Sequence, residues 1–245
     1  MDSETIIESI KDNIKVVRLN KPRRKNAIDY AMYVRLTKIV NDAATDNSIS
    51  IIVLTGTGDF YSSGNDLVAS READFLQVLE DFIKAFITFP KLLIAVVNGP
   101  AVGVAVTILP LFDFVFASEN AYFYTPFTKL NIVAEGCSSF TFPRLIGARK
   151  AMELLLLNYK MPAKEALECG LISNLYKTEE LQQKAWEKIE EISYLPEHSV
   201  ITTKSLMRRT YMEDLLRTNA IEIEELRKIS NNASNMDLNN KSKRN

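Results

Sequence analysis

The sequence predicts an α/β protein in which strands and helices alternate up to about residue 175 and helices alone follow. Short apolar runs of strand length, such as 51–55 and 92–97, are rich in branched residues. Segments with apolar residues at helical spacing lie between them, as in 29–40 and 73–89. From residue 179 onward the whole pattern is typical of helices. Together these observations indicate one large α/β core with a helical C-terminal region.

The N-terminal segment predicts two short strands and a basic loop. The residues of 6–10 and 14–19 alternate in the way of strands, and the turn-forming Lys11-Asp12-Asn13 joins them. The loop Lys21–Ala27 carries four basic residues. Such a loop is either a solvated connector or a site for a phosphorylated ligand.

Composition excludes several classes of function. The chain has 245 residues and a net charge of −1, which disfavours a dedicated nucleic-acid-binding protein. No apolar run approaches the roughly 20 residues of a membrane span. Cys137 and Cys169 give no disulfide framework. His198 is the one histidine, in a segment typical of a surface loop, which disfavours a histidine-based triad or a zinc site.

Two glycine-bearing turns follow predicted buried strands. Gly64 follows the strand at 50–55, and Gly103 follows the strand at 92–97 and precedes an apolar helix start. The first turn of a helix has unpaired N–H donors that can stabilise an oxyanion. The alternative is a buried strand–helix turn without chemistry.

Glu135 is the candidate general base. It is the only acid in the segment 131–139, where its neighbours are apolar. Apolar surroundings disfavour the charged carboxylate and raise its pKa toward that of a working base. The alternative is a glutamate in the first turn of a helix, favoured by the helix dipole.

Taken in order, these segments resemble the crotonase (enoyl-CoA hydratase/isomerase) superfamily over about residues 12–228. The matching segments are Lys21–Ala27, Phe60–Leu67, Asn98–Val104, Glu135–Ser139 and Ala163–Leu171. Within it, Asn98–Ala101 with Glu135–Pro143 looks like the peroxisomal Δ3,Δ2-enoyl-CoA isomerase branch. The resemblance implies a ββα spiral core over 1–175 and a helical region over 176–230 that supports trimerisation. Residues 231–245 are rich in Asn and Ser, and we expect a disordered tail there.

The resemblance also implies a set of catalytic residues. The backbone N–H groups of Asn65 and Val104 would form the oxyanion hole, and Glu135 would be the base. Hydratases carry two further glutamates, at positions occupied here by Thr107 and Phe127, so water addition is disfavoured. The implied reaction moves the double bond of a 3-enoyl-CoA to the trans-2 position during fatty-acid β-oxidation. A single carboxylate would shuttle the proton across a dienolate.

The family binds coenzyme A across the basic loop and the first glycine turn. The substrate-binding residues that this implies are Arg23, Lys25, Ala27, Ser62, Ser63, Gly64, Asn65, Asp66, Leu67, Gly103, Val104 and Phe127. Arg24 is a further candidate for the phosphates, as is Lys204 or Arg208 on a late helix, from the same or a neighbouring subunit. Aromatic and leucine side chains could line an acyl channel, with core packing as the alternative; these are Phe86, Phe89, Leu109, Phe112, Phe127 and Phe140.

By the same resemblance we expect an acyl-CoA substrate, no cofactor or metal, no nucleic-acid partner and a homotrimer or dimer of trimers. We expect an intracellular location, peroxisomal by resemblance with the mitochondrion as the alternative. The C-terminal Ser242-Lys243-Arg244-Asn245 does not match the Ser-Lys-Leu type signal of peroxisomal members. Two other functions stay open: another acyl-CoA enzyme of the superfamily, or a non-catalytic acyl-CoA-binding or scaffold protein resembling the chromodomain Y-like proteins, which lack the glutamate.

Overall fold

A six-stranded sheet forms the centre of the computed structural model, which describes residues 4–66 and 72–242, with the side chains of 232–242 left out of the description. In spatial order its strands are β1 (Ile6–Lys11), β2 (Ile14–Leu19), β3 (Ile51–Gly56), β4 (Leu92–Val97), β6 (Phe114–Ser118) and β9 (Asn174–Tyr176). The hairpin β1–β2 is antiparallel, and the other neighbours are parallel because longer connections join them. The predicted strands are confirmed, including the hairpin at the N-terminus.

The carboxyl ends of β3 and β4 lie side by side at one edge of this sheet. The segment after β3 leads into the first glycine turn, and the segment after β4 leads into the second. A smaller sheet continues from this edge, with strands β5 (Ala101–Val102), β7 (Tyr122–Tyr124) and β8 (Lys160–Pro162). The topology therefore brings the two turns together although they are distant in sequence.

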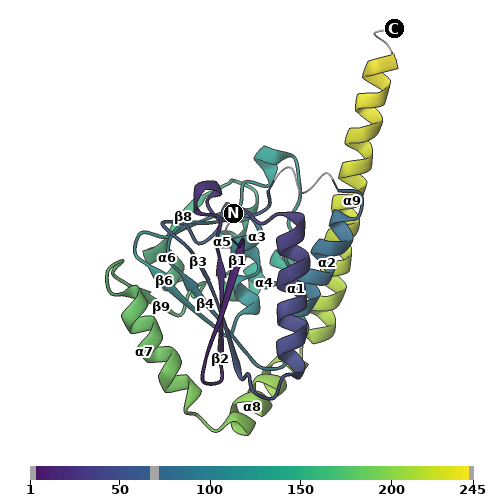
Figure 1. The fold of residues 1–245 in the computed structure, drawn as a ribbon. Coiled ribbons are helices and arrows are strands. Elements are labelled where there is room, and N and C mark those ends of the chain that lie inside the picture. Colours follow the sequence, from purple (N-terminus) through teal and green to yellow (C-terminus); the bar gives the residue numbers. More distant parts are fainter. Residues whose placement is uncertain (1–3, 67–71, 243–245) are drawn as a thin grey trace.

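Helices cover the sheet on both faces (Figure 1). The helices are α1 (Tyr30–Thr45), α2 (Phe75–Thr88), α3 (Val104–Thr107), α4 (Ser138–Leu145), α5 (Ala148–Leu155), α6 (Ala163–Glu168), α7 (Leu181–Ser193), α8 (Glu197–Arg209) and α9 (Met212–Ser242). Asp29 caps α1 as its position before the apolar stripe predicts, since its carboxylate accepts the N–H of Met32 at 2.9 Å. Helix α2 packs against α1 and α9.

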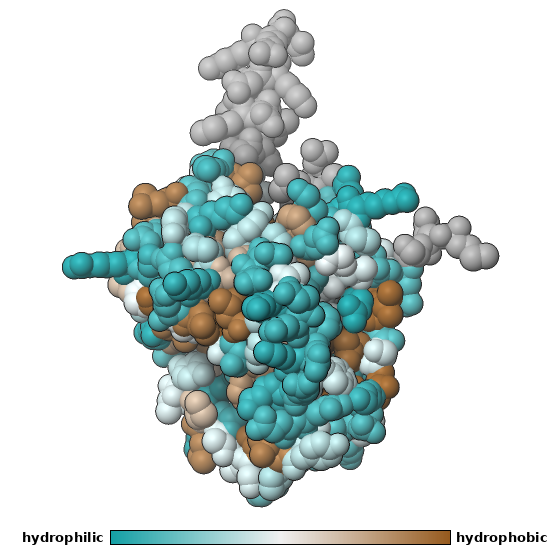
Figure 2. All heavy atoms as spheres, turned by 90° about the vertical axis from the view of Figure 1, so that its left-hand side faces the viewer, coloured by the Kyte–Doolittle hydropathy of each residue, from teal (hydrophilic) through white to brown (hydrophobic). Residues whose placement is uncertain are grey.

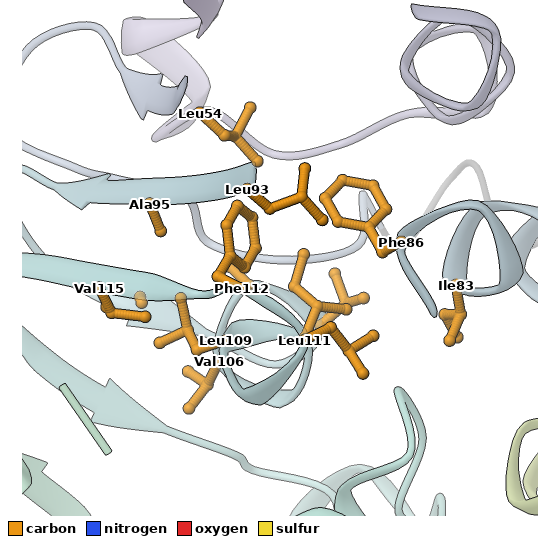
Figure 3. Packing of buried hydrophobic residues seen from close by; sticks show 14 of the residues in the cluster. Leu54, Ile83, Phe86, Leu93, Ala95, Val106, Leu109, Leu111, Phe112 and Val115 are labelled. Atoms are coloured by element: carbon orange, nitrogen blue, oxygen red, sulfur yellow. The ribbon is translucent and has the colours of Figure 1, made fainter. Parts of the chain in front are cut away.

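The main core lies between the sheet and the helices α1 and α2. Figure 3 shows Phe86 of α2 beside Leu93 of β4 and Phe112, and the rings of Phe86 and Phe112 are 5.5 Å apart. Leu109 and Leu111 pack into the same cluster. This core holds the segment around α3 firmly in place beneath the second glycine turn.

Helix α7 covers the other face of the sheet and buries a smaller apolar cluster there. Leu181, Ala185 and Ile189 of α7 pack against strand residues such as Ile94 and Val96. Figure 2 shows that the outer surface on this side is mostly hydrophilic, with separate apolar patches. Within the described residues, no helix combines the length and the apolar character needed to cross a membrane.

The C-terminal helix corrects one expectation. The backbone of residues 231–242 continues α9 to Ser242, where the composition predicts a disordered tail. Once a helix is nucleated, each further residue adds a hydrogen bond at little entropic cost, so a polar extension can remain helical. Figure 1 shows the C-terminal end of α9 projecting beyond the body of the protein.

Candidate active site

The two glycine turns meet at Gly64 and Gly103. Gly64 has φ +80°, and a Cβ on it would lie 2.5 Å from the carbonyl oxygen of Val102. Gly103 has φ +60°, and a Cβ on it would lie 4.0 Å from the Cα of Gly64. Positive φ favours glycine at both positions, and at Gly64 the close approach of the Val102 carbonyl oxygen also leaves no room for a side chain. The contact places the residues after the two glycines, Asn65 and Val104, next to one another.

The backbone N–H groups of Asn65 and Val104 are free for a ligand. The N–H of Ile28 donates to Gly64, and the N–H of Asp66 donates to Ile28, so the N–H of Asn65 points away from that contact. Val104 is the first residue of α3, where a helix has no internal acceptor for the N–H. In the described part of the chain, neither N–H donates a backbone hydrogen bond. Two adjacent free donors suit an oxygen that gains negative charge.

These two residues line a cavity of about 500 Å³. One side of it is basic, with Arg23, Arg24 and Lys25 from the loop before α1. The other side is apolar and consists of Val102, Pro126, Phe127, Leu130 and Ile132. A cavity with one cationic and one apolar side suits a ligand that has an anionic part and an apolar part.

Most of the substrate-binding residues inferred from the sequence line this cavity. They are Arg23, Lys25, Ala27, Ser63, Asn65, Asp66, Gly103, Val104 and Phe127. Ser62 and Gly64 lie behind the surface of the cavity. The Ser62 hydroxyl donates to the carbonyl of Asn26 and accepts the N–H of Gly64, so it supports the first turn. Leu67 lies outside the described residues.

Asn26 fixes the basic loop to the first glycine turn, and sequence reasoning missed this role. Its buried amide group donates to the carbonyl oxygens of Thr57 and Phe60 at 2.9 and 2.7 Å. Its side-chain oxygen accepts the N–H of Lys21 at 2.9 Å. The sequence does offer one signal for this role, because Asn26 directly follows a basic run. Asparagine readily adopts a positive φ in turns, and Asn26 has φ 54°.

Glu135 lies beside α3, one helical turn from Val104. Its Oε1 is 3.0 Å from the hydroxyl of Thr107, and that hydroxyl is also 3.3 Å from the carbonyl oxygen of Val104. Glu135 is 2% exposed, and within the described residues its Oε2 has no hydrogen-bond partner. Thr107 has one hydroxyl proton, and it donates this proton to Oε1 of Glu135 in the shorter of the two contacts.

Burial, and after it the nearby carboxylate of Glu222, raise the pKa of Glu135 to about 8. The hydrogen bond from Thr107 lowers the pKa and opposes both effects. A carboxyl group with this pKa can give and take a proton near neutral pH. The apolar neighbours in the sequence predict the direction of this shift, and the burial confirms it.

Two further residues of the site could not be found from the sequence pattern alone. Tyr33 of α1 is fully buried, and its hydroxyl donates to the side-chain oxygen of Asn65. Glu222 of α9 is 5% exposed and accepts hydrogen bonds from Cys137 and Ser139, just after Glu135. Glu222 has one weak signal, because it lies at helical spacing with the buried Leu215, on the apolar face of α9.

Lys204 and Arg208 do not reach this cavity. Both are buried and pair with Asp113, and they also donate to backbone carbonyl oxygens, as Lys204 does to Lys91. They line a different cavity of about 600 Å³ beside α8. Neither residue therefore holds phosphates of a ligand in the cavity of its own subunit, and a contribution to the cavity of a neighbouring subunit stays a prediction. The long side chains of Lys204 and Arg208 reach inward from α8 because Asp113 and the backbone carbonyl groups provide partners there.

The proposed acyl-channel residues divide between cavity and core. Phe86, Phe89 and Leu109 are packed in the main core, and Phe112 lies there too and also lines the cavity beside α8. Phe127 lines the cavity at the two turns, and the ring of Phe140 stacks on Arg144. Core packing is therefore the correct alternative for four of the six residues: Phe86, Phe89, Leu109 and Phe112.

The comparison with known families decides the assignment of the fold. The sequence profile of the family described as enoyl-CoA hydratase/isomerase matches residues 9–242. The chain belongs to the enoyl-CoA hydratase/isomerase family. The predicted crotonase fold agrees with a solved structure, "enoyl-CoA hydratase/isomerase from Pseudoalteromonas atlantica", with a TM-score of 0.88 and 28% identity. The similarity covers 92% of this chain and 91% of that one.

Curated relatives include members of the family that are named as isomerases. The chain is 41% identical over 230 residues to mouse "Enoyl-CoA delta isomerase 3, peroxisomal". The aligned region covers 90% of this chain and 72% of the mouse protein. It is 41% identical to human "Enoyl-CoA delta isomerase 2" over 89% of this chain. The match spans only 58% of that human protein's length. A family relative of another kind is human "Testis-specific chromodomain protein Y 1", 31% identical over 91% of this chain and 43% of its own length.

Proposed function

We propose that this protein is a Δ3,Δ2-enoyl-CoA isomerase that uses Glu135 as its single acid–base residue. The observation that carries the proposal is the position of Glu135, which is buried against Thr107 of α3 and, within the described residues, has no hydrogen-bond partner for Oε2. Relatives named as isomerases at 41% identity support the same conclusion.

The proposed reaction moves one proton. The Glu135 carboxylate removes a proton from C2 of a 3-enoyl-CoA, and the electrons of that C–H bond delocalise into a dienolate. The N–H groups of Asn65 and Val104 hold the thioester oxygen as it gains negative charge, each contributing on the order of 3 kcal/mol in the transition state. The protonated Glu135 then returns the proton to C4, which leaves the double bond at C2. Atoms and charge balance without a further reactant.

In the proposed complex, the basic side of the cavity binds the phosphates of coenzyme A. Arg23 and Lys25 lie on this side, while Arg24 lies 3.6 Å from the carboxylate of Asp66. The apolar wall around Phe127 faces the acyl chain. At the positions of the two hydratase glutamates, Thr107 and Phe127 offer no second carboxylate to activate water, which favours isomerisation over hydration.

We further propose a homotrimer or dimer of trimers and a peroxisomal location in fatty-acid β-oxidation. The location is supported by the mouse relative, whose name describes it as peroxisomal. The assembly is supported by the resemblance to the family. The second candidate function is acyl-CoA binding without catalysis. It is favoured by the 31% identity to a chromodomain protein, and by the fact that Glu135 does not line the cavity.

The deciding experiment follows conversion of a 3-enoyl-CoA to the conjugated 2-enoyl-CoA by absorbance, with wild type and Glu135→Gln compared. Binding of the same thioesters is measured by calorimetry. We expect the wild type to isomerise and Glu135→Gln to lose most of the rate while it still binds. A wild type that binds acyl-CoA but is inert would support the binding protein instead. Equal rates for both proteins would remove Glu135 from the mechanism.

A further inference from the structure

Glu222 of α9 makes three hydrogen bonds to the segment directly after Glu135. One carboxylate oxygen accepts the N–H of Cys137 at 2.7 Å. The other accepts the N–H of Ser139 at 2.9 Å and the Ser139 hydroxyl at 2.6 Å. Since all three partners are donors, they match the ionised carboxylate, which only accepts.

These bonds fix an unusual helix start. Cys137 precedes the first residue of α4 and has φ 62°, and its own side chain does not cap the helix. Gly136 before it also has positive φ, and a Cβ there would lie 2.4 Å from the Thr107 hydroxyl. The carboxylate of Glu222 satisfies the free N–H groups at the start of α4, where a negative charge is favourable. The loop is therefore held from α9 on one side and from α3 on the other.

A second contact ties the same loop to α9. The Cys137 thiol donates to the carbonyl oxygen of Leu215 at 3.4 Å, two helical turns before Glu222. Asn219, between them on this face, donates from its amide group to the carbonyl oxygen of Glu80 in α2. Helix α9 is thus anchored to the body of the protein where it meets the loop.

We propose that Glu222 is a positioning residue for the proposed isomerase reaction, because its three hydrogen bonds hold the 135–139 loop and with it the backbone of Glu135. The charge of Glu222 also acts on Glu135 across this loop. This inference rests on the proposed function. Glu222 bonds to the backbone of Cys137 and Ser139, so it acts through the loop that carries Glu135.

The groups around Glu135 set the sign of the electrostatic effect. Glu222 from α9 is the charged neighbour that raises the pKa of Glu135, after burial itself. Thr107 from α3 lowers it by its hydrogen bond. Tyr33 from α1 and Cys137 from the loop are neutral near pH 7, because burial raises the pKa of each well above its ordinary value. Removal of the Glu222 charge is therefore expected to lower the pKa of Glu135.

The test compares Glu222→Gln, Glu222→Asp and the control Glu225→Gln. Glu225 lies on the same helix, is exposed and pairs with Lys228. In protein labelled with ¹³C at glutamate carboxyl carbons, the Glu135 signal is assigned by its loss in Glu135→Gln and titrated against pH. The kcat and KM for a 3-enoyl-CoA are measured alongside.

We expect Glu222→Gln to move the Glu135 titration to lower pH and to reduce kcat on the order of 10- to 100-fold, with KM nearly unchanged. Glu222→Asp keeps the charge and is expected to restore the titration toward wild type, while Glu225→Gln behaves as wild type. A Glu135 titration that does not move in Glu222→Gln would overturn the proposal. The NMR titration needs no turnover, so an inactive wild type would refute the proposed function and still leave this inference tested.

Should Glu222→Gln fail to fold, as judged by circular dichroism, Ser139→Ala removes one of the three bonds from an exposed position. We then expect kcat to fall severalfold without a change in KM. A folded Ser139→Ala with wild-type kcat would overturn the proposal.

Discussion

The hydroxyl oxygen of Thr107 lies 3.0 Å from Oε1 of Glu135, at the position where hydratases of the family carry a catalytic glutamate. A hydroxyl at this place cannot act as a second acid–base group near neutral pH. It can orient the carboxyl group of Glu135 and lower its pKa. Thr107 therefore holds the carboxyl group of Glu135, the proposed base, in a fixed direction.

Substitution Thr107→Val is expected to raise the pKa of Glu135 further, because it removes the hydrogen bond that lowers it and keeps the side-chain shape. The acidic limb of the kcat/KM profile should move to higher pH, and the rate at pH 7 should fall. Steady-state kinetics from pH 6 to 9 measure this. A profile with an unchanged acidic limb would show that the hydroxyl does not affect the ionisation of the base.

The stability of the wild type is expected to fall as pH rises, relative to Glu135→Gln. The folded pKa of Glu135 is raised from 4.5 to about 8, so the folded state holds this proton more tightly than the unfolded state does. The resulting stabilisation is complete below the unfolded pKa and is lost between about pH 4.5 and 8. Urea unfolding of both proteins at pH 5, 7 and 8.5 measures the difference. If the free energy of unfolding depends on pH in the same way for both proteins, Glu135 is not the group that holds this proton.

Gly64→Ala is expected to cost more stability than Gly103→Ala. Both glycines have positive φ, which costs an alanine about 1–3 kcal/mol. At Gly64 the new Cβ would also lie 2.5 Å from the Val102 carbonyl oxygen, while the nearest atom at Gly103 is at 4.0 Å. Thermal and urea unfolding rank the two variants. If Gly103→Ala loses more stability than Gly64→Ala, the backbone of the 62–66 turn can shift to accommodate the new Cβ.

Arg23→Ala is expected to raise KM for coenzyme A thioesters about tenfold with kcat unchanged, because a phosphate contact made equally in ground and transition states affects binding alone. A pantetheine thioester, which lacks the nucleotide phosphates, should show no difference between wild type and variant. Lys38→Ala, exposed on α1 and paired with Asp42, is the matched control. An equal loss with the pantetheine substrate would contradict a role for Arg23 in phosphate binding.

The elements that position the site could be predicted because local pattern determines them. The strand at 92–97 is apolar throughout and is buried throughout, and Gly103 follows it at a turn that needs positive φ. Glu135 stands out as a lone acid among apolar neighbours, and it is buried. In each case the cause lies within about ten residues of sequence.

The residues whose roles could not be predicted have partners that are distant in the sequence. Tyr33 of α1 contacts Asn65 in the first glycine turn, and its position in the sequence is that of any buried residue of an amphipathic helix. Lys204 and Arg208, four residues apart on α8, look like a solvated basic pair, yet one carboxylate, Asp113, and several carbonyl groups hold them inside. Sequence spacing places such residues on a helix face but does not identify their partners.

The bond between Cys137 and Glu222 spans 85 residues, and this has a consequence for biosynthesis. On the ribosome, the strands, both glycine turns and Glu135 are all made before the codon for residue 222 is read. A nascent chain that already contains every reacting group still lacks the carboxylate that holds its base. Premature termination just before residue 222 would therefore yield a polypeptide that contains Glu135 without the carboxylate of Glu222, and that also lacks Ile223 and Leu226 of the main core.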